Sequence, residues 1–365
     1  HIGENNFEIF KTFTQESSVS IVGEVVKNER ASGGYEIFVN SFDILQISND
    51  YPITPKDHGT DFLMNHRHLW LRSKRQYAIL KIRHQIIKAI RDFFDINDFT
   101  LIDTPIFTPN AAEGTSTLFE TDYFDTKAYL CQTGQLYGEA SAMAFGRHYN
   151  FGPCFRAEKS KTRRHLTEFW MVEPEIAYCN IDENMVWAEK LITYIIGEVV
   201  KNKKNELIIL ERDIAILEKV KGNFPRITYT DCIKLLQDGG FNIKWGDDFG
   251  SPEETYISKK HEQPIIVYGF PSKIKAFYMK RNPNDKRVVL GMDILAPEGY
   301  GEIVGGSERE TDINVLLDRI EQEGLNKKDY EWFLDLRKYG SVPHSGFGMG
   351  LERVVAWICG ISHIR

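Results

Sequence analysis

The 365-residue sequence contains no Gly-Lys dipeptide, no Cys-x-x-Cys pair and no long apolar run. Without Gly-Lys the chain has no phosphate loop of the Gly-x-x-x-x-Gly-Lys type. No apolar run approaches the roughly 18 residues of a membrane-spanning helix, so we expect no membrane partner. The five cysteines are scattered along the chain. They are typical of reduced thiols in a cytoplasmic protein, although an organellar form stays open.

A positive net charge is also missing. The net charge is −7, so overall charge does not indicate a nucleic-acid partner, and any such contact must come from a local patch. Hydrophobic residues make up 42% of the chain and charged residues 27%, which is typical of a soluble protein with a filled core. The length suits two domains, or one large domain with an appendage.

Three segments of the chain differ in pattern. Residues 1–50 contain alternating strand-like runs joined by a Gly pair, which predicts part of a small β-domain whose start is missing. Residues 51–73 contain two prolines and a glycine in a linker-like stretch. Residues 74–365 begin with helical apolar spacing and continue with runs of strands between helices, not alternating β-α-β units. This order predicts an α+β fold with an antiparallel sheet flanked by helices.

Particular elements follow from the same patterns. Helices are expected over residues 74–95, 185–201 and 207–220. Strands are expected over residues 99–105, 128–131, 149–157, 169–172, 263–268, 276–279, 288–294 and 301–304.

The most informative stretch runs from Arg156 to Phe169. On a strand, Arg156 and Glu158 would point the same way. A short basic loop follows, and His165 and Phe169 come back four residues apart. The stretch offers a cation for a phosphate, a carboxylate for an amino group and an aromatic face for a flat base. It therefore predicts a β-hairpin that binds ATP, with a solvated salt bridge as the alternative.

Two further groups suit a nucleotide. Residues 346–350 read as a tight glycine turn that opens an amphipathic helix carrying Arg353, either as a simple helix cap or as a close approach to a phosphate or purine. The third glycine falls one place early for a dinucleotide fingerprint. Asp293 and Glu302 lie on neighbouring predicted strands, where they are either ordinary polar residues or oxygen ligands for Mg²⁺.

In this order the segments resemble the three motifs of the class II aminoacyl-tRNA synthetases. The first helix with Pro105 resembles motif 1, the Arg156 hairpin resembles motif 2, and the glycine segment with Arg353 resembles motif 3. The resemblance covers roughly residues 18–365. Within the aspartate, asparagine and lysine subgroup it is greatest to the asparagine-specific members, in residues 112–119, 132–139, 166–175 and 301–310. It implies a class II catalytic domain over 74–365 and a partial N-terminal OB-fold β-barrel that binds the anticodon.

The resemblance also implies roles for individual residues. Catalysis falls to Arg156 and Arg353, and no protein nucleophile is needed. The implied ATP-binding residues are Arg156, Glu158, His165, Leu166, Phe169, Glu302, Gly350 and Arg353. The implied amino-acid-binding residues are Glu113, Gln135, Glu173 and Arg309, and Mg²⁺ would be held by Asp293 and Glu302. The acceptor end of the tRNA would meet Lys159, Lys161, Arg163 and Arg164. The family further implies a homodimer formed through motif 1.

The choice of amino acid depends on few positions. The aspartate enzymes place a Lys where this chain has Gly138, so the cation that favours aspartate is absent. Glu173 stands where those enzymes have Asp, and its carboxylate can accept from an asparagine amide and repel aspartate. The implied activity is therefore ATP-dependent attachment of asparagine to tRNA(Asn). The alternatives are a non-discriminating aspartate enzyme, a relative that makes asparagine or modifies another acceptor, and a non-catalytic RNA- or protein-binding module.

Overall fold

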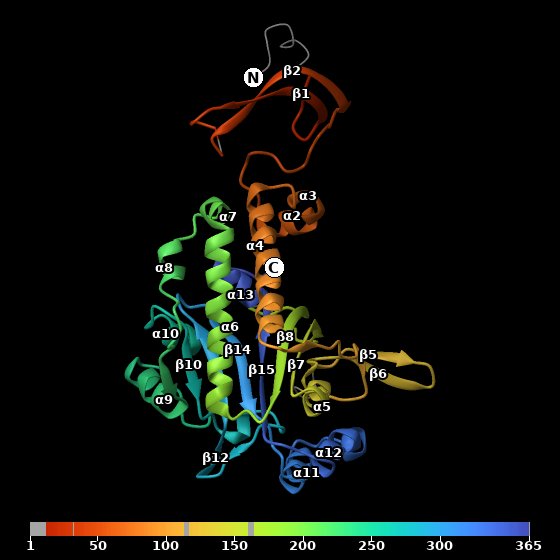
Figure 1. The fold of residues 1–365 in the computed structure, drawn as a ribbon, viewed down its shortest axis with the longest axis vertical. Helices are drawn as coiled ribbons and strands as arrows, with labels where there is room; N and C mark the ends of the chain where they lie inside the picture. Colours follow the sequence, from red (N-terminus) through yellow and green to blue (C-terminus); the bar gives the residue numbers. More distant parts are fainter. Residues whose placement is uncertain (1–11, 32, 113–116, 160–163, 365) are drawn as a thin grey trace. The chain divides into compact units, whose positions relative to one another are not determined.

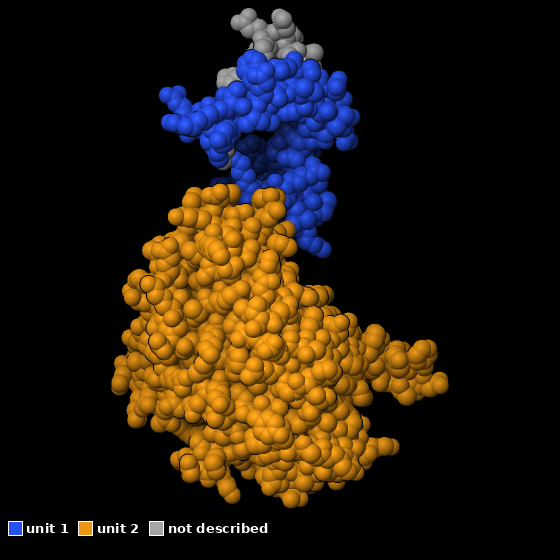
Figure 2. Space-filling view, in the orientation of Figure 1, with its two compact units in different colours: residues 1–76 blue, residues 77–365 orange. Residues whose placement is uncertain are grey.

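The computed structural model describes residues 12–31, 33–112, 117–159 and 164–364 (Figure 1). The chain divides into two compact units, residues 1–76 and residues 77–365 (Figure 2). The sequence pattern changed character slightly earlier, between residues 73 and 74. None of the described helices is long and apolar enough to cross a membrane.

The described part of the first unit contains a two-stranded antiparallel sheet. Strands β1 (Ser18–Lys27) and β2 (Tyr35–Gln46) pair over their whole length. Gly33 and Gly34 both have positive φ, 85° and 77°, in the connection between them. This confirms the small β-element and its glycine turn, while closure into an OB-fold barrel stays a prediction. The expected linker instead contains two short helices, α2 (Thr60–Asn65) and α3 (Arg67–Trp70).

An eight-stranded sheet forms the centre of the second unit, in the order β3-β7-β8-β15-β14-β13-β10-β9. Its strands are β3 (Thr100–Leu101), β7 (Arg147–Phe155), β8 (Glu168–Ala177), β9 (Arg226–Thr228), β10 (Ile265–Tyr268), β13 (Gly291–Ala296), β14 (Gly301–Glu308) and β15 (His344–Gly350). The two edge pairs, β3–β7 and β10–β9, are parallel, and all inner pairs are antiparallel. The predicted α+β fold with a mainly antiparallel sheet is confirmed.

Helices α4 (Lys74–Ile96), α6 (Ile181–Asn202) and α13 (Leu351–Cys359) share the main hydrophobic core with one face of this sheet (Figure 1). In α4 the buried residues recur at helical spacing, among them Ile82, Ile86 and Ala89, as the sequence predicted. Helix α6 begins with a capping box in which Asn180 and Glu183 satisfy each other's backbone N–H groups. The helical layer therefore covers one face and leaves the other face for a site.

The remaining elements surround this centre. The other helices are α5 (Gln135–Phe145), α7 (Lys204–Ile209), α8 (Ile214–Glu218), α9 (Tyr229–Asp238), α10 (Ser251–Ser258), α11 (Ile313–Gln322) and α12 (Glu331–Lys338). The 3-10 turn η3 (Ser272–Ile274) follows β10, and η4 (Lys327–Tyr330) lies between α11 and α12. Strands β4 (Phe107–Thr108), β5 (Glu120–Tyr123) and β6 (Thr126–Leu130) form a three-stranded sheet, and β11 (Arg281–Asn282) pairs with β12 (Asp285–Val289).

Four predicted elements were wrong. The strand expected over 288–294 is divided between β12 and β13, which belong to different sheets. The helix expected over 207–220 is divided into α7 and α8, because Glu211 has a positive φ of 57° and Asp213 caps a new helix. Residues 276–279 form turns with one isolated bridge, from Met279 to Arg309, and not a strand. The expected glycine turn at 346–350 is most of strand β15.

The glycines of β15 allow close approach to the neighbouring strand. A Cβ atom on Gly346 would come within 2.2 Å of Glu175 Oε1, and one on Gly348 within 2.4 Å of Met171 Cε. Side chains of β8 therefore lie over β15 where any larger residue would collide with them. These glycines serve a strand contact, and the sharp change of direction occurs only at Gly350, the N-cap of α13.

Candidate active site

A cavity of about 320 Å³ opens on the sheet face away from α4 and α6, and the first turn of α13 contributes Arg353 to its lining. Thirteen residues predicted for the site line it: Gln135, Arg156, Glu158, Arg164, His165, Leu166, Phe169, Glu173, Asp293, Glu302, Arg309, Gly350 and Arg353. Lys159 is described but does not line the cavity. Glu113, Lys161 and Arg163 lie outside the described residues.

These residues come together because successive side chains of a strand point to opposite faces of the sheet. On β8, Phe169, Met171 and Glu173 line the cavity, whereas Val172 and Ile176 belong to the core beneath the helices. Arg156 and Glu158 follow β7, which ends at residue 155. They therefore lie in the loop, and not on the strand as predicted, yet both line the cavity.

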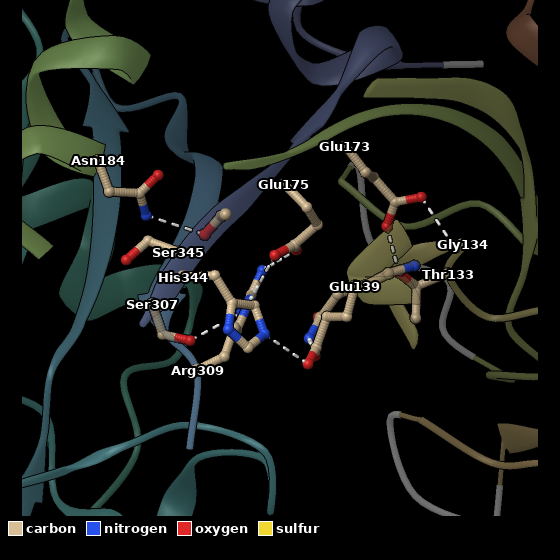
Figure 3. A network of polar contacts seen from close by, with 12 residues as sticks. Thr133, Gly134, Glu139, Glu173, Glu175, Asn184, Ser307, Arg309, His344 and Ser345 are labelled. Carbon is tan, nitrogen blue, oxygen red and sulfur yellow. Dashed lines mark hydrogen bonds and ion pairs between the residues drawn. The ribbon is translucent and has the colours of Figure 1, made fainter. Parts of the chain in front are cut away.

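Arg309 at the end of β14 forms a buried ion pair with Glu175 of β8 (Figure 3). Its Nε donates to Glu175 Oε2 at 3.2 Å, Nη2 donates to Oε1, and Nη1 donates to Ser307 Oγ at 2.7 Å. Burial raises the pKa of Glu175, and the charge of Arg309 opposes that rise. The cation at this end of the cavity is thus already balanced by a carboxylate.

Glu173 is the second buried carboxylate at this end (Figure 3). Thr133 Oγ1 donates to Oε1, and the Gly134 N–H donates to Oε2 at 2.9 Å. Burial raises the pKa of Glu173, while these hydrogen bonds act in the other direction. The carboxylate is therefore held in place by the protein before any ligand arrives.

Glu139 on α5 forms a third buried cluster behind the same end. Arg337 of α12 donates to Oε2 through Nη2, and His344 Nε2 lies 2.9 Å from the same oxygen. Gln135 Nε2 donates to Oε1 at 3.1 Å. Burial alone would raise the pKa of Glu139, but the charge of Arg337 and the hydrogen bond with His344 outweigh it and lower that pKa to about 2.

The other end of the cavity is more open. Arg353 Nη1 donates to the Glu302 carbonyl oxygen at 2.9 Å and lies 3.1 Å from Glu302 Oε2. The Arg156 guanidinium lies over the Phe169 ring, 5.4 Å from its centroid. His165 Nε2 lies 3.9 Å from Glu158 Oε2. An aromatic face and two guanidinium groups are thus close together, as a base and its phosphates require.

Asp293 and Glu302 come from the paired strands β13 and β14 and line the same cavity. Lys275 Nζ lies 2.7 Å from Asp293 Oδ2. Burial and the charge of Glu302 raise the pKa of Asp293 to about 7 against the pull of Lys275. Because the charge of Glu302 opposes ionisation of Asp293, a divalent cation held by both carboxylates would relieve that repulsion. No group of three or more His, Cys, Asp or Glu residues suited to a metal occurs in the described ranges, so the remaining ligands would be phosphate oxygens.

Arg164, expected to meet tRNA, is instead connected to the body of the second unit. Its Nη1 donates to Glu254 Oε2 at 3.2 Å, and its Nη2 donates to Thr255 Oγ1 at 2.5 Å and to the Gly299 carbonyl oxygen. Burial lowers the pKa of Arg164, and the charge of Glu254 opposes that change. The side chain therefore fixes the end of its loop against α10, and contact with tRNA stays a prediction.

Behind the cavity, Gly138 allows another close approach. A Cβ atom there would lie 2.8 Å from His148 Nε2 and 3.3 Å from Glu175 Cγ. His148 is fully buried, and burial lowers its pKa to about 4. The space next to position 138 is therefore filled by a neutral imidazole.

Several residues at the site were not identified from the sequence: Thr133, Glu139, Glu175, Lys275, Arg337 and His344. Their partners are far away along the chain. Arg309 is 134 residues from Glu175, and Arg337 is 198 residues from Glu139. No local pattern joins such pairs. The one available signal was that Thr133, Glu139 and Glu175 belong to blocks matched by the resemblance.

The cavity has the composition of a site for an amino acid next to a nucleotide. One end is closed, with the carboxylates of Glu173 and Glu175 held by hydrogen bonds from the protein, and can recognise a small polar ligand by hydrogen bonds. The other end offers guanidinium groups, an aromatic ring and two carboxylates. No nucleophilic side chain is needed for chemistry between two ligands held end to end.

Comparison with known proteins gives a consistent result. The family model for tRNA synthetases class II (D, K and N) matches residues 59–365. An asparagine–tRNA ligase of Desulforamulus reducens is 55% identical over 98% of this chain and 84% of the relative. An asparagine–tRNA ligase of Sorangium cellulosum is 52% identical over 100% of this chain and 84% of the relative.

Solved structures agree with the sequences. Asparaginyl-tRNA synthetase of Pyrococcus horikoshii, complexed with asparaginyl-adenylate, superposes with a TM-score of 0.96 at 45% identity over 100% of this chain and 84% of that chain. Aspartyl tRNA synthetase of Entamoeba histolytica gives a TM-score of 0.81 at 27% identity over 97% of this chain and 77% of that chain.

Proposed function

Because the chain belongs to the class II tRNA synthetases of the aspartate, lysine and asparagine group, we propose that it is an asparagine–tRNA ligase. It joins asparagine to ATP as asparaginyl-adenylate and then transfers the asparaginyl group to tRNA(Asn). The observation that carries this proposal is identity of 52–55% over nearly the whole chain to proteins with that activity. The cavity described above provides the two ends that the first reaction needs.

In the first step the carboxylate of asparagine attacks the α-phosphorus of ATP, and pyrophosphate leaves. We assign Arg156 to the α-phosphate, where negative charge increases in the transition state. Phe169 and Arg353 are assigned to the two faces of the adenine, and His165 and Arg353 to the γ-phosphate. Arg156 lies over the Phe169 ring, so it moves off that face when the base enters. Catalysis is then positioning and charge stabilisation.

A divalent cation belongs to the same proposal. Asp293 and Glu302 would hold Mg²⁺ against the triphosphate, and the ion supplies positive charge that offsets the charge of the phosphates. Support comes from the two mutually repelling carboxylates within one cavity. Arg353 and Lys275 meanwhile balance those carboxylates within the protein.

The closed end supports asparagine over aspartate. Arg309 can donate to the side-chain carbonyl, and Glu173 can accept from the side-chain amide. Glu175 already balances the charge of Arg309, so Arg309 has no uncompensated charge to offer a second substrate carboxylate. Gln135, and Glu113 outside the described residues, are assigned to the α-ammonium group. An aspartate side chain would meet Glu173 without a compensating cation, which is unfavourable in a buried site.

The second step brings the terminal adenosine of tRNA(Asn), whose 3′ hydroxyl takes the asparaginyl group. Lys159 and Arg164, with Lys161 and Arg163 outside the described residues, are assigned to the acceptor end, where phosphate contacts supply affinity. The cytoplasm is the proposed location, in keeping with five buried cysteines that are not joined in disulfides. Two chains are proposed to pair through motif 1, where Tyr77 and Leu80 of α4 are exposed. A purified protein that is only monomeric by light scattering would contradict the dimer.

ATP–pyrophosphate exchange with purified protein tests the activity. Asparagine should support rapid exchange, and aspartate should be at least about 100-fold less effective by kcat/KM, because it leaves a charge unpaired at Glu173. Transfer of radiolabelled asparagine to tRNA(Asn) completes the test. Equal exchange with the two amino acids would instead identify a non-discriminating aspartate enzyme. Absence of exchange with either would leave a binding module.

A further inference from the structure

Glu139 is a buried carboxylate to which neither step of the proposed reaction assigns a role. It lies on α5, one helical turn after Gln135, which lines the cavity while Glu139 itself does not. Its two oxygens have different partners. Oε2 is contacted by His344 Nε2 (Figure 3) and by Arg337 Nη2, and Oε1 accepts from Gln135 Nε2 at 3.1 Å. The cluster thus joins α5, α12 and β15 immediately behind the amino-acid end.

The charge on Glu139 determines which way the Gln135 amide points. Arg337 and His344 keep the carboxylate ionised, with its pKa lowered to about 2. An ionised carboxylate can only accept hydrogen bonds, whereas a glutamine amide has a donor end and an acceptor end. The NH₂ group of Gln135 must therefore face Glu139. The amide oxygen is left as the atom that Gln135 offers to a ligand in the cavity.

We propose that Glu139 is a positioning residue that fixes the polarity of the Gln135 amide, so that an oxygen and not an NH₂ group meets the substrate's α-ammonium. This inference rests on the proposed function, because it uses the assignment of Gln135 to that group. A reversed amide would present two N–H donors to a cation. Glu139 therefore affects recognition of the substrate's amino group through the orientation of Gln135, although Glu139 itself does not contact the substrate.

The variant Glu139→Gln makes a specific prediction. Arg337 can only donate, so the new side chain turns its oxygen toward Arg337, and His344 Nε2 can donate to the same oxygen. Its nitrogen then occupies the place of Oε1, and Gln135 must rotate its amide to offer an oxygen to that nitrogen. The NH₂ group of Gln135 now faces the cavity. Each hydrogen bond within the cluster keeps a partner, so the protein should fold while the polarity at the cavity is reversed.

The experiment compares asparagine with succinamate, which is asparagine without the α-amino group. Asparagine KM and succinamate Ki are measured in ATP–pyrophosphate exchange for wild type and Glu139→Gln. Loss of one hydrogen bond to a charged group changes affinity by about 10- to 100-fold. We expect the asparagine KM to rise by that factor, while the succinamate Ki and the ATP KM stay within about twofold. A general loosening of the cavity would weaken both ligands together.

A double variant in which the amide and the carboxylate exchange positions should restore recognition of the amino group. In the double variant Gln135→Glu/Glu139→Gln the new carboxylate accepts from the new amide and keeps its second oxygen for the ammonium group. The preference for asparagine over succinamate should return toward the wild-type value. Glu298→Gln is the matched control, since Glu298 pairs with Arg212 away from the cavity, and it should change neither constant.

Two failures are distinguishable. A wild-type protein that does not activate asparagine would overturn the proposed function and this inference with it. A wild type that activates asparagine, combined with an unchanged asparagine-to-succinamate ratio in Glu139→Gln, would overturn the inference alone. So would a double variant that stays as impaired as the single one while folding normally by circular dichroism.

Discussion

The two ends of the cavity are built differently. At the amino-acid end the side chains of Arg309 and Glu175 are 3% and 1% exposed, and they pair with each other. At the nucleotide end the side chains of Arg353 and Glu302 are 28% and 35% exposed. A buried ion pair costs much to break, whereas a half-exposed one exchanges partners readily with water or a ligand. The amino-acid end is therefore rigid and selective, and the nucleotide end can rearrange around a triphosphate.

The largest expected effect separates stability from activity. Arg309→Ala leaves Glu175 buried without its cation, which should lower the free energy of unfolding by about 3–5 kcal/mol and abolish asparagine activation. Arg353→Ala should also abolish ATP–pyrophosphate exchange, but it should change stability by only about 0–1 kcal/mol because its ion pair is partly solvated. Urea unfolding of both variants measures the difference.

The Arg309 result has an internal check. Without Arg309, burial raises the pKa of Glu175 further, so the folded variant takes up a proton that the unfolded chain does not hold at neutral pH. A carboxyl group with a raised folded-state pKa loses stability as pH rises. The deficit of Arg309→Ala should therefore be smaller at pH 5 than at pH 8. Equal stability losses for Arg309→Ala and Arg353→Ala would contradict the contrast between the two ends.

The rigid end should also carry the larger pH dependence, through His148. Its pKa is lowered to about 4 by burial, against about 6.5 in an unfolded chain. Between these values the unfolded state binds the proton and the folded state does not. Above pH 6.5 His148 therefore does not reduce the free energy of unfolding. As the pH is lowered from 6.5 to 4, its protonation in the unfolded state reduces that free energy by about 3 kcal/mol. Replacement of His148 by Leu should remove this part of the pH dependence of urea unfolding. An unchanged pH profile in that variant would show that His148 does not contribute.

The sequence predicted the helical layer and much of the sheet because their signals are local. Helix α4 follows directly from apolar residues at helical spacing, and its buried face is the predicted one. The prediction of a turn around Gly346 was wrong because glycine occurs in proteins for two different reasons. It permits a turn, and it permits close packing, and only the tertiary contact with Glu175 decides between them.

In the candidate site, too, residues in local motifs were predicted and contacts between distant parts of the chain were not. Arg156, Phe169 and Arg353 were predicted from short motifs, and their order along the chain carried the family resemblance. The pairing of Arg309 with Glu175 was not predicted, since the two residues are 134 positions apart. Gly138 was interpreted as the loss of a lysine, but the structure adds a physical reason. His148 fills the space next to it, so a lysine introduced at 138 alone would collide.

The smallest expected effect concerns the aromatic ring at the open end. Phe169→Leu removes the face on which Arg156 lies and on which the adenine is proposed to stack. We expect the ATP KM to rise about 5- to 10-fold, because stacking on an aromatic side chain contributes about 1–3 kcal/mol per base and leucine keeps part of the contact. The asparagine KM should stay within twofold, and the melting temperature should change little.

The same substitution in the core gives the opposite result. Phe94 lies on α4 and is 1% exposed, so Phe94→Leu should lower the free energy of unfolding by about 1–2 kcal/mol, part of the cost of removing a whole buried ring. It should leave the ATP KM unchanged. If Phe169→Leu destabilised the protein as much as Phe94→Leu, the ring would be a packing element, and the nucleotide end would be as fixed as the amino-acid end. A rise in the ATP KM without loss of stability would instead leave binding as the function of that ring.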